Sequence, residues 1–228
     1  MPQENPLDVV RPAQLERLPM FPLPRTVLFP GVTLPLHLFE PRYRELAEHC
    51  VTGDRLLALA ALKPGYEDAY LDRPPVFEVM GLGRIVAEQR LPDGRWNIAL
   101  RGLCRVEILA EHPPTASFRE VHAKRLESDP RHVEPAALDR LRGTLIQLAS
   151  RVQGVRQQLA PLFAASSDPA ALTDIAAALF VESFAVRREL LEQLSVAKRL
   201  AMLEELLAQV LLDVAFKNGG GSEPVGLG

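Results

Sequence analysis

Cysteine is scarce in this chain, which has two among its 228 residues, Cys50 and Cys104. The two lie far apart in the sequence, and no CxxC pair or cluster of histidines accompanies them. Neither a disulfide framework nor a zinc site is therefore indicated. We accordingly expect no bound metal, and we expect a reducing cytoplasm as the location of the protein.

The sequence also lacks long apolar runs and an excess of positive charge. Apolar stretches such as residues 56–62 and 210–214 are much shorter than the roughly 20 residues that span a bilayer. Residues 1–17 lack the apolar core of a signal peptide. Lys and Arg number 26 against 29 Asp and Glu, and the sequence has no basic block to follow a phosphate backbone. Neither a membrane nor a nucleic acid is an expected partner.

Signatures of nucleotide binding and of catalysis are missing as well. No glycine is followed by lysine, so the phosphate-binding motif GxxxxGKS or GxxxxGKT is absent. Gly81 and Gly83 begin a GxGxxG pattern, but the position of its third glycine is Val86. No GxSxG motif is present. Ser183 and Lys198 are not expected to form a catalytic Ser/Lys pair, because Ser183 lies between helical segments and Lys198 on a solvated helix face. We therefore expect no cofactor, no catalytic residue and no enzymatic activity.

The first half of the chain is rich in short β-branched or apolar runs that Pro and Gly separate. This pattern predicts a mixed, mainly antiparallel barrel or sheet up to about Glu127. The Pro, Asp and Gly of residues 91–95 predict a hairpin turn between two of the runs. One helix is expected to begin at Pro41 and to end at Gly53. The expected strands are residues 26–29, 32–36, 56–61, 84–89, 96–100 and 104–109.

The second half, after a polar link at residues 128–132, has the apolar period of helices. An apolar stripe along residues 138–155 predicts the first helix. Asp168 and Ser195 are placed to cap two more helices, and Leu203 belongs to the apolar stripe of the last one. A bundle with a shared core explains these stripes better than a free coiled coil. The polar side chains expected to face solvent in the last helix are Lys198, Arg199, Glu204, Glu205, Gln209 and Asp213.

The expected fold class is therefore α+β, with a β subdomain at residues 18–127 and a helical bundle subdomain at residues 128–216. Residues 1–17 are expected to be a flexible amino-terminal segment. Residues 217–228 contain three consecutive glycines and have little to bury, so we expect a disordered tail. Whether the helical subdomain also forms a homodimer is left open.

Five segments share the residues, order and spacing of a known family. They are residues 18–43 (LPMFPLPRTVLFPGVTLPLHLFEPRY), 77–86 (FEVMGLGRIV), 100–106 (LRGLCRV), 172–176 (LTDIA) and 188–192 (RELLE). Together they resemble the Lon amino-terminal, substrate-recognition domain family over roughly residues 18–216. The resemblance implies a PUA-like β subdomain followed by a helical subdomain, and a role in binding proteins or peptides.

Full-length Lon proteases also carry an ATPase and a Ser/Lys peptidase, and the motifs of both are missing from this sequence. The resemblance therefore implies a non-catalytic recognition module for unfolded or tagged polypeptides, and it leaves open a partnership with a separate protease. A PUA-like protein that binds RNA or a small molecule is the alternative. Against RNA stand the net negative charge and the lack of a basic stripe interleaved with aromatic residues. A hydrolase is a third alternative, which the missing signatures disfavour.

The strand-to-helix junction at residues 36–43 is where we expect a client to bind, because crevices between subdomains are concave and junction loops present side chains. The expected substrate-binding residues are His37, Phe39, Arg42, Tyr43 and Trp96. His37 is expected to hydrogen-bond a backbone group rather than to hold a metal. Of the large apolar candidates, one or two are expected to be exposed. These candidates are Met20, Phe21, Phe39, Tyr43 and Trp96.

Overall fold

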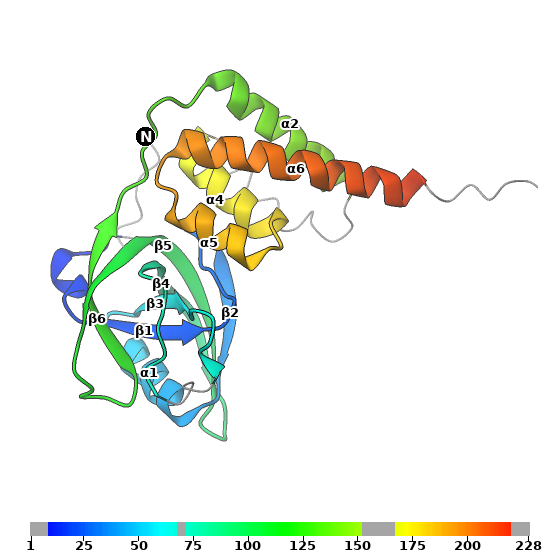
Figure 1. Cartoon of the computed structure of the whole chain (residues 1–228). Coiled ribbons are helices and arrows are strands. Elements are labelled where there is room, and N and C mark those ends of the chain that lie inside the picture. Colours follow the sequence, from blue (N-terminus) through cyan, green and yellow to red (C-terminus); the bar gives the residue numbers. More distant parts are fainter. Residues whose placement is uncertain (1–8, 68–71, 152–166, 220–228) are drawn as a thin grey trace, which may run out of the picture. The chain divides into compact units, whose positions relative to one another are not determined.

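The computed structural model describes residues 9–67, 72–151 and 167–219, which form two compact units (Figure 1). Unit 1 comprises Met1–Ser128 and Glu182–Leu194, and unit 2 comprises Asp129–Val181 and Ser195–Gly228. Glu182–Leu194 therefore packs with unit 1, although the sequence places it within the helical subdomain. Parts of the expected flexible segment and disordered tail, residues 1–8 and 220–228, lie outside the described residues.

A closed sheet forms the centre of unit 1. The order of the strands is β2-β5-β4-β3-β1-β6, and β5 also pairs with β6, so that five strands close into a barrel with β2 added beside β5. All strand pairs are antiparallel except β1 with β3. The expected mixed, mainly antiparallel architecture is thus confirmed. The strands are β1 (Leu18–Leu23), β2 (Thr33–Leu38), β3 (Leu56–Ala61), β4 (Val79–Arg90), β5 (Trp96–Glu111) and β6 (Arg119–Leu126).

Most of the expected strands are confirmed, and residues 96–100 and 104–109 are two parts of the single strand β5. The hairpin turn at residues 91–95 is confirmed as well, because the Gly94 N–H donates to the Leu91 carbonyl at 2.9 Å. Two strands, β1 and β6, were not predicted. Strand β1 is buried along nearly its whole length, so it shows no alternation, and Pro19 and Pro22 resemble strand breakers.

The predicted strand at residues 26–29 is wrong, because these residues form a loop. Their apolar character has another cause, since Val27, Leu28 and Phe29 are all buried. The loop lies directly against the sheet at Gly81 and Gly102. A Cβ added to Gly81 would lie 2.0 Å from the Leu28 carbonyl oxygen, and one added to Gly102 would lie 2.1 Å from the Phe29 carbonyl oxygen. Both glycines are therefore required by the close approach of two backbones.

Two helical segments from the first half of the chain pack on the sheet. Helix α1 (Pro41–Thr52) begins and ends as predicted, with the Gly53 N–H donating to the His49 carbonyl at 3.0 Å, and it contacts β1, β2 and β4. Its buried face includes Cys50, and burial raises the pKa of that thiol to about 12. The short 3-10 helix η2 (Pro12–Leu15) buries Leu15 in the core, so this part of the expected flexible segment is folded.

Helix α5 (Phe184–Glu192) also belongs to unit 1. The buried Arg105 of β5 donates from Nε to the carbonyl of Leu191 at 2.8 Å, in the last turn of the helix. The Arg188 guanidinium lies 4.3 Å from the centre of the Phe77 ring. A cation at a helix carboxyl end and a cation over an aromatic ring both stabilise this packing.

Unit 2 contains the three predicted helices, α2 (Pro135–Arg151), α4 (Pro169–Phe180) and α6 (Val196–Gly219). Helix α6 packs against both α2 and α4. Asp168 caps α4 by accepting the Ala170 N–H at 2.9 Å. Val152 and Val155, at the end of the predicted first stripe, lie outside the described residues. No helix in the described part of the chain is both long enough and apolar enough to cross a membrane. The stripe residues buried as expected are Leu138, Leu141, Leu145, Leu148, Val196, Leu200, Leu203 and Leu207.

Arg199 corrects the prediction for the polar face of α6, because its side chain is fully buried. Its Nε lies 3.6 Å from Oδ1 of Asp174 and donates to Oγ1 of Thr173 at 3.2 Å. Both partners belong to α4 and are themselves buried. An ionic residue can lie on the buried face when another helix supplies its partner.

Candidate functional site

The five predicted site residues do not form one cluster. His37 and Phe39 face solvent, with Phe39 55% exposed, whereas Tyr43 and Trp96 belong to the core cluster of unit 1. Arg42 is half-buried. Met20 and Phe21 are buried too, so the expectation that one or two of the large apolar candidates are exposed is confirmed. Strand alternation explains why His37 and Phe39 face solvent, because Leu38 between them points into the core.

His37 hydrogen-bonds a side chain, so the expected backbone partner is wrong. Its Nδ1 lies 2.7 Å from Oδ1 of Asn97, and its Nε2 lies 3.3 Å from Nη1 of Arg95. Asn97 is directly opposite His37 in the register of β2 with β5, where cross-strand side chains come close. The His37 ring also stacks on the Phe39 ring, with 6.0 Å between the two ring centroids. In the described part of the chain no three His, Cys, Asp or Glu side chains could hold a metal together.

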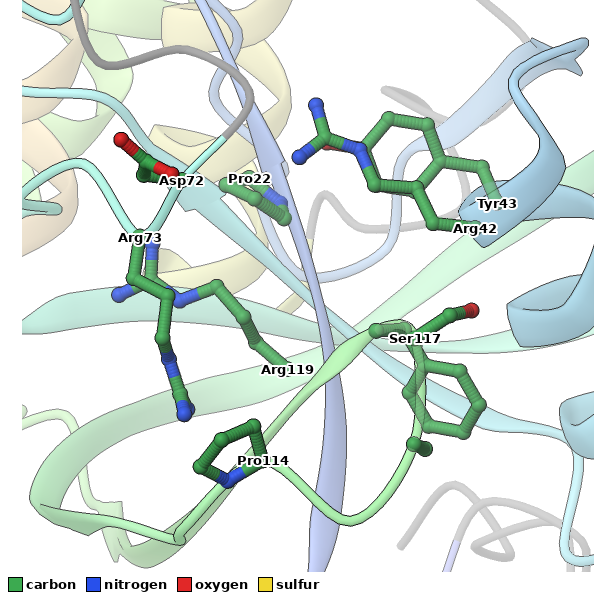
Figure 2. Close-up of a pocket in the computed structure, with 10 residues that line it drawn as sticks. Pro22, Arg42, Tyr43, Asp72, Arg73, Pro114, Ser117 and Arg119 are labelled. Atoms are coloured by element: carbon green, nitrogen blue, oxygen red, sulfur yellow. The ribbon is translucent and has the colours of Figure 1, made fainter.

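A pocket of about 170 Å³ opens in unit 1 beside the amino end of α1, and Arg42 and Tyr43 line it (Figure 2). Figure 2 shows Arg73 and Arg119 on the other side of the pocket. Asp72 and Ser117 complete its polar lining. The apolar wall consists of Pro22, Tyr43, Pro114, Ala116 and Phe118. We call this hollow the arginine pocket.

The arginines of the pocket are held in place by carboxylates. Arg119 donates from Nε and Nη2 to the two oxygens of Glu111 at 2.6 and 2.8 Å, and from Nη1 to the Pro74 carbonyl at 2.7 Å. Arg73 donates to the same carboxylate of Glu111, from Nε at 2.9 Å. On the opposite side of the pocket, Nη2 of Arg42 lies 3.0 Å from Oε2 of Glu40. Because two guanidinium groups share Glu111, the group of three keeps one positive charge.

The pKa of Glu111 is lower than usual. Burial alone would raise it, but the hydrogen bonds and charges of Arg119 and Arg73 outweigh burial. The free energy that this carboxylate contributes is complete above the unfolded pKa of about 4.3 and is lost as the pH falls through the lower folded pKa.

We expect Glu111→Gln to destabilise unit 1 by about 1–2 kcal/mol at neutral pH, because hydrogen bonds to a charged group are replaced by weaker ones. The difference from the parent should shrink in acid, where the parent also loses the charge. Urea unfolding followed by Trp96 fluorescence at several pH values measures both effects. Glu107→Gln is the control, since Glu107 of β5 pairs with the amine of Lys124, whose side chain is 52% exposed, and loss of such a pair should cost less. A stability difference that stays constant down to acid pH would contradict the role of Glu111.

The loop at residues 112–118 forms one wall of the pocket and is fixed at several points. Ser117 donates from Oγ to Oε2 of Glu45 on α1 at 2.6 Å. Thr115 accepts from Nη2 of Arg17 at 2.7 Å, and the Phe118 ring lies 5.1 Å from that of His49. This wall is therefore pre-organised, which lowers the entropy lost when a ligand binds.

The sequence pointed to Arg42 and Tyr43 but not to Arg73, Arg119 or the loop. Arg73 meets Glu111 from 38 positions away, and no spacing rule connects them. Chemically, the arrangement offers an apolar wall and fixed cationic donors, which suit binding and orientation of a ligand.

Comparison with known proteins gives one consistent result. The family model for the ATP-dependent protease La (LON) substrate-binding domain matches residues 17–209. The Lon protease of Trichlorobacter lovleyi is 28% identical over 204 residues, and that of Heliobacterium modesticaldum is 27% identical over 203 residues. These alignments cover 85% and 86% of this chain but 24% of each relative. The chain therefore spans about a quarter of the length of the curated relatives it matches.

Two solved structures share the fold. The N-terminal domain of Mycobacterium avium complex Lon protease matches with a TM-score of 0.61 and 19% identity, covering 84% of this chain and 98% of that one. A Lon N-terminal domain protein from Xanthomonas campestris matches with a TM-score of 0.61 and 22% identity, covering 84% and 97%. These two likenesses confirm the α+β architecture.

Proposed function

Because the chain belongs to the family of Lon substrate-binding domains, we propose that it recognises polypeptide segments through the arginine pocket and performs no chemistry on them. The family-matched region, residues 17–209, contains the pocket and both of its fixed walls. A protease in another chain is the partner that would act on the bound segment. The chain itself then supplies recognition only.

The observation that carries the proposal is the combination of an apolar wall with immobilised guanidinium groups in one hollow. Unfolded polypeptides expose apolar side chains and backbone carbonyl groups together, whereas folded proteins bury most of the large apolar side chains and pair most of the carbonyl groups. Tyr43 and Phe118 offer apolar contact, and Arg42 and Arg73 bring guanidinium donors to the same lining. Such a pocket favours an unfolded segment over a folded surface.

The other predicted site residues have different proposed roles. His37 and Phe39 form an exposed aromatic pair, which we assign to a second, weaker contact with the bound polypeptide. Trp96 is buried and supports the junction from the core. RNA binding gains no support, since three arginines gathered in one pocket do not form the basic stripe that follows a phosphate backbone.

The test is to fill the pocket without removing a structural contact. Ala116 is half-buried and lines the pocket, so Ala116→Trp should weaken binding of a fluorescent, permanently unfolded protein by about tenfold or more. Tyr43→Ala is unsuitable, because Tyr43 belongs to the core. The matched control is Ala201→Trp, at an exposed position of α6, which should bind like the parent. Equal binding by the two variants, with unchanged melting, would place the site elsewhere.

A further inference from the structure

Two further hollows border α1, of about 480 and 340 Å³. The first shares Ala116 and Phe118 with the arginine pocket, and it shares Arg17 and His49 with the second. The three hollows are therefore neighbours along α1, and all of them lie in unit 1. We call them together the α1 trough. Helix α1 forms one wall, and the loop at residues 112–118 and η2 supply the other.

Charge is divided along the α1 trough. At the amino end of α1, three arginines line the wall together with one carboxylate, Asp72. The middle hollow is lined by Glu45, Glu48 and Glu120. Glu120 accepts from Nε of Arg17 at 2.9 Å, so those two charges cancel.

Glu45 and Glu48 are both exposed toward solvent. Glu48 lies 3.7 Å from Nη1 of Arg90, and such an exposed ion pair is weak. The middle of the trough is therefore acidic, whereas its end at the amino terminus of α1 is lined by three guanidinium groups whose partners Glu40 and Glu111 lie outside the lining. A ligand that carries both signs of charge is complementary to the trough in one orientation only.

We propose that the α1 trough holds an extended polypeptide segment with an apolar residue and an adjacent carboxylate in the arginine pocket, and a basic side chain beside Glu45 and Glu48. This inference rests on the proposed function and specifies its substrate class. Helix α1 has 12 residues and is about 18 Å long at 1.5 Å per residue. At about 3.3 Å per residue in an extended chain, that length accommodates about five residues.

An extended segment fits this shape better than a helix. The Ser117 to Glu45 hydrogen bond and the Phe118 to His49 ring contact cross between the walls, so the trough is interrupted by a ridge between the arginine pocket and the middle hollow. A helix about 10 Å wide would collide with such a ridge. A single extended strand crosses it and places its side chains in the hollows on either side.

The experiment is a pair of double-mutant cycles between the full-length protein and a labelled peptide of about seven residues. The peptide carries Asp beside Leu near one end and Lys about three residues away, because Arg42 and Glu48 lie about 9 Å apart along α1 at 1.5 Å per residue. One cycle combines Glu48→Gln with replacement of the peptide Lys by Gln. The other combines Arg42→Gln with replacement of the peptide Asp by Asn. We expect each single change to weaken binding by about threefold to fivefold, with the double change no weaker than the single ones.

Exchanging the Asp and Lys of the peptide should remove both couplings, because the charges then face like charges. Glu205→Gln on α6, an exposed position outside the trough, should show no coupling with the peptide Lys. Two results together would overturn the trough and leave the proposed function intact. The first is that the parent binds the unfolded protein and Ala116→Trp does not. The second is that the protein and peptide changes have additive effects in both cycles. Absence of binding to both peptide and unfolded protein would remove the proposed function itself.

Discussion

Leu203→Asp should abolish cooperative folding of unit 2. Leu203 has no exposed surface, and its helix α6 packs against α2 and α4. Removal of a buried leucine alone costs about 2–5 kcal/mol. A carboxylate left among apolar side chains adds a desolvation cost of several kcal/mol. Since domains are stable by about 5–15 kcal/mol in total, we expect the helices of unit 2 to be largely unfolded at room temperature.

Far-ultraviolet circular dichroism during thermal and urea unfolding measures this loss. Leu212→Asp is the matched control, since Leu212 lies on the same helix with 54% of its surface exposed, and the same substitution there should cost little. The one tryptophan of the sequence, Trp96, lies in unit 1, so its fluorescence reports on that unit separately. If Leu203→Asp melted within about a degree of Leu212→Asp, the buried stripe would be assigned wrongly.

The helical stripes were predictable because helix periodicity is a local property. The spacing that places Leu203 on a buried face is visible within a few turns of sequence, and so are the caps at Asp168 and Ser195. The limits of α1 were predictable for the same reason, since Pro41 and Gly53 are local signals. For elements of this kind the sequence pattern and the final structure agree.

The strands that were missed depend on partners distant in sequence. Strand β1 is central and buried, so its residues carry no alternation, and its pairing with β3 and β6 is not encoded locally. The loop at residues 26–29 looks like a strand because it is apolar, and it is apolar because it packs on Gly81 and Gly102. The same apolar pattern thus has two structural causes, which periodicity alone does not distinguish.

The candidate site likewise combines residues that local sequence signals predict with residues that depend on long-range contacts. Arg42 and Tyr43 were predicted from the junction between β2 and α1, a feature of neighbouring residues. Arg73 and Arg119 meet at Glu111, from segments that come together only when the sheet has formed. Long-range ion pairs of this kind cannot be inferred from spacing in a single sequence, and they set the charge of the pocket.

Replacing Arg199 alone should destabilise unit 2 by more than replacing it together with its partner. Arg199 is fully buried, the Asp174 side chain is 3% exposed, and Nε and Oδ1 lie 3.6 Å apart. In Arg199→Met the carboxylate of Asp174 stays buried without this cation, at a cost of about 3–5 kcal/mol. In the double variant Arg199→Met with Asp174→Leu no buried charge of this pair remains, and we expect most of the lost stability to return.

Arg140→Met is the matched control, because Arg140 pairs with Glu204 of α6 at 2.8 Å with its side chain 60% exposed. An exposed pair of this kind contributes about 0–1 kcal/mol. Urea unfolding of the four proteins, followed by circular dichroism, ranks them directly. The expected order of stability places Arg140→Met next to the parent, the double variant below it, and Arg199→Met lowest. A double variant less stable than Arg199→Met would contradict this order, because it would mean that Asp174 stabilises the helical core without its arginine.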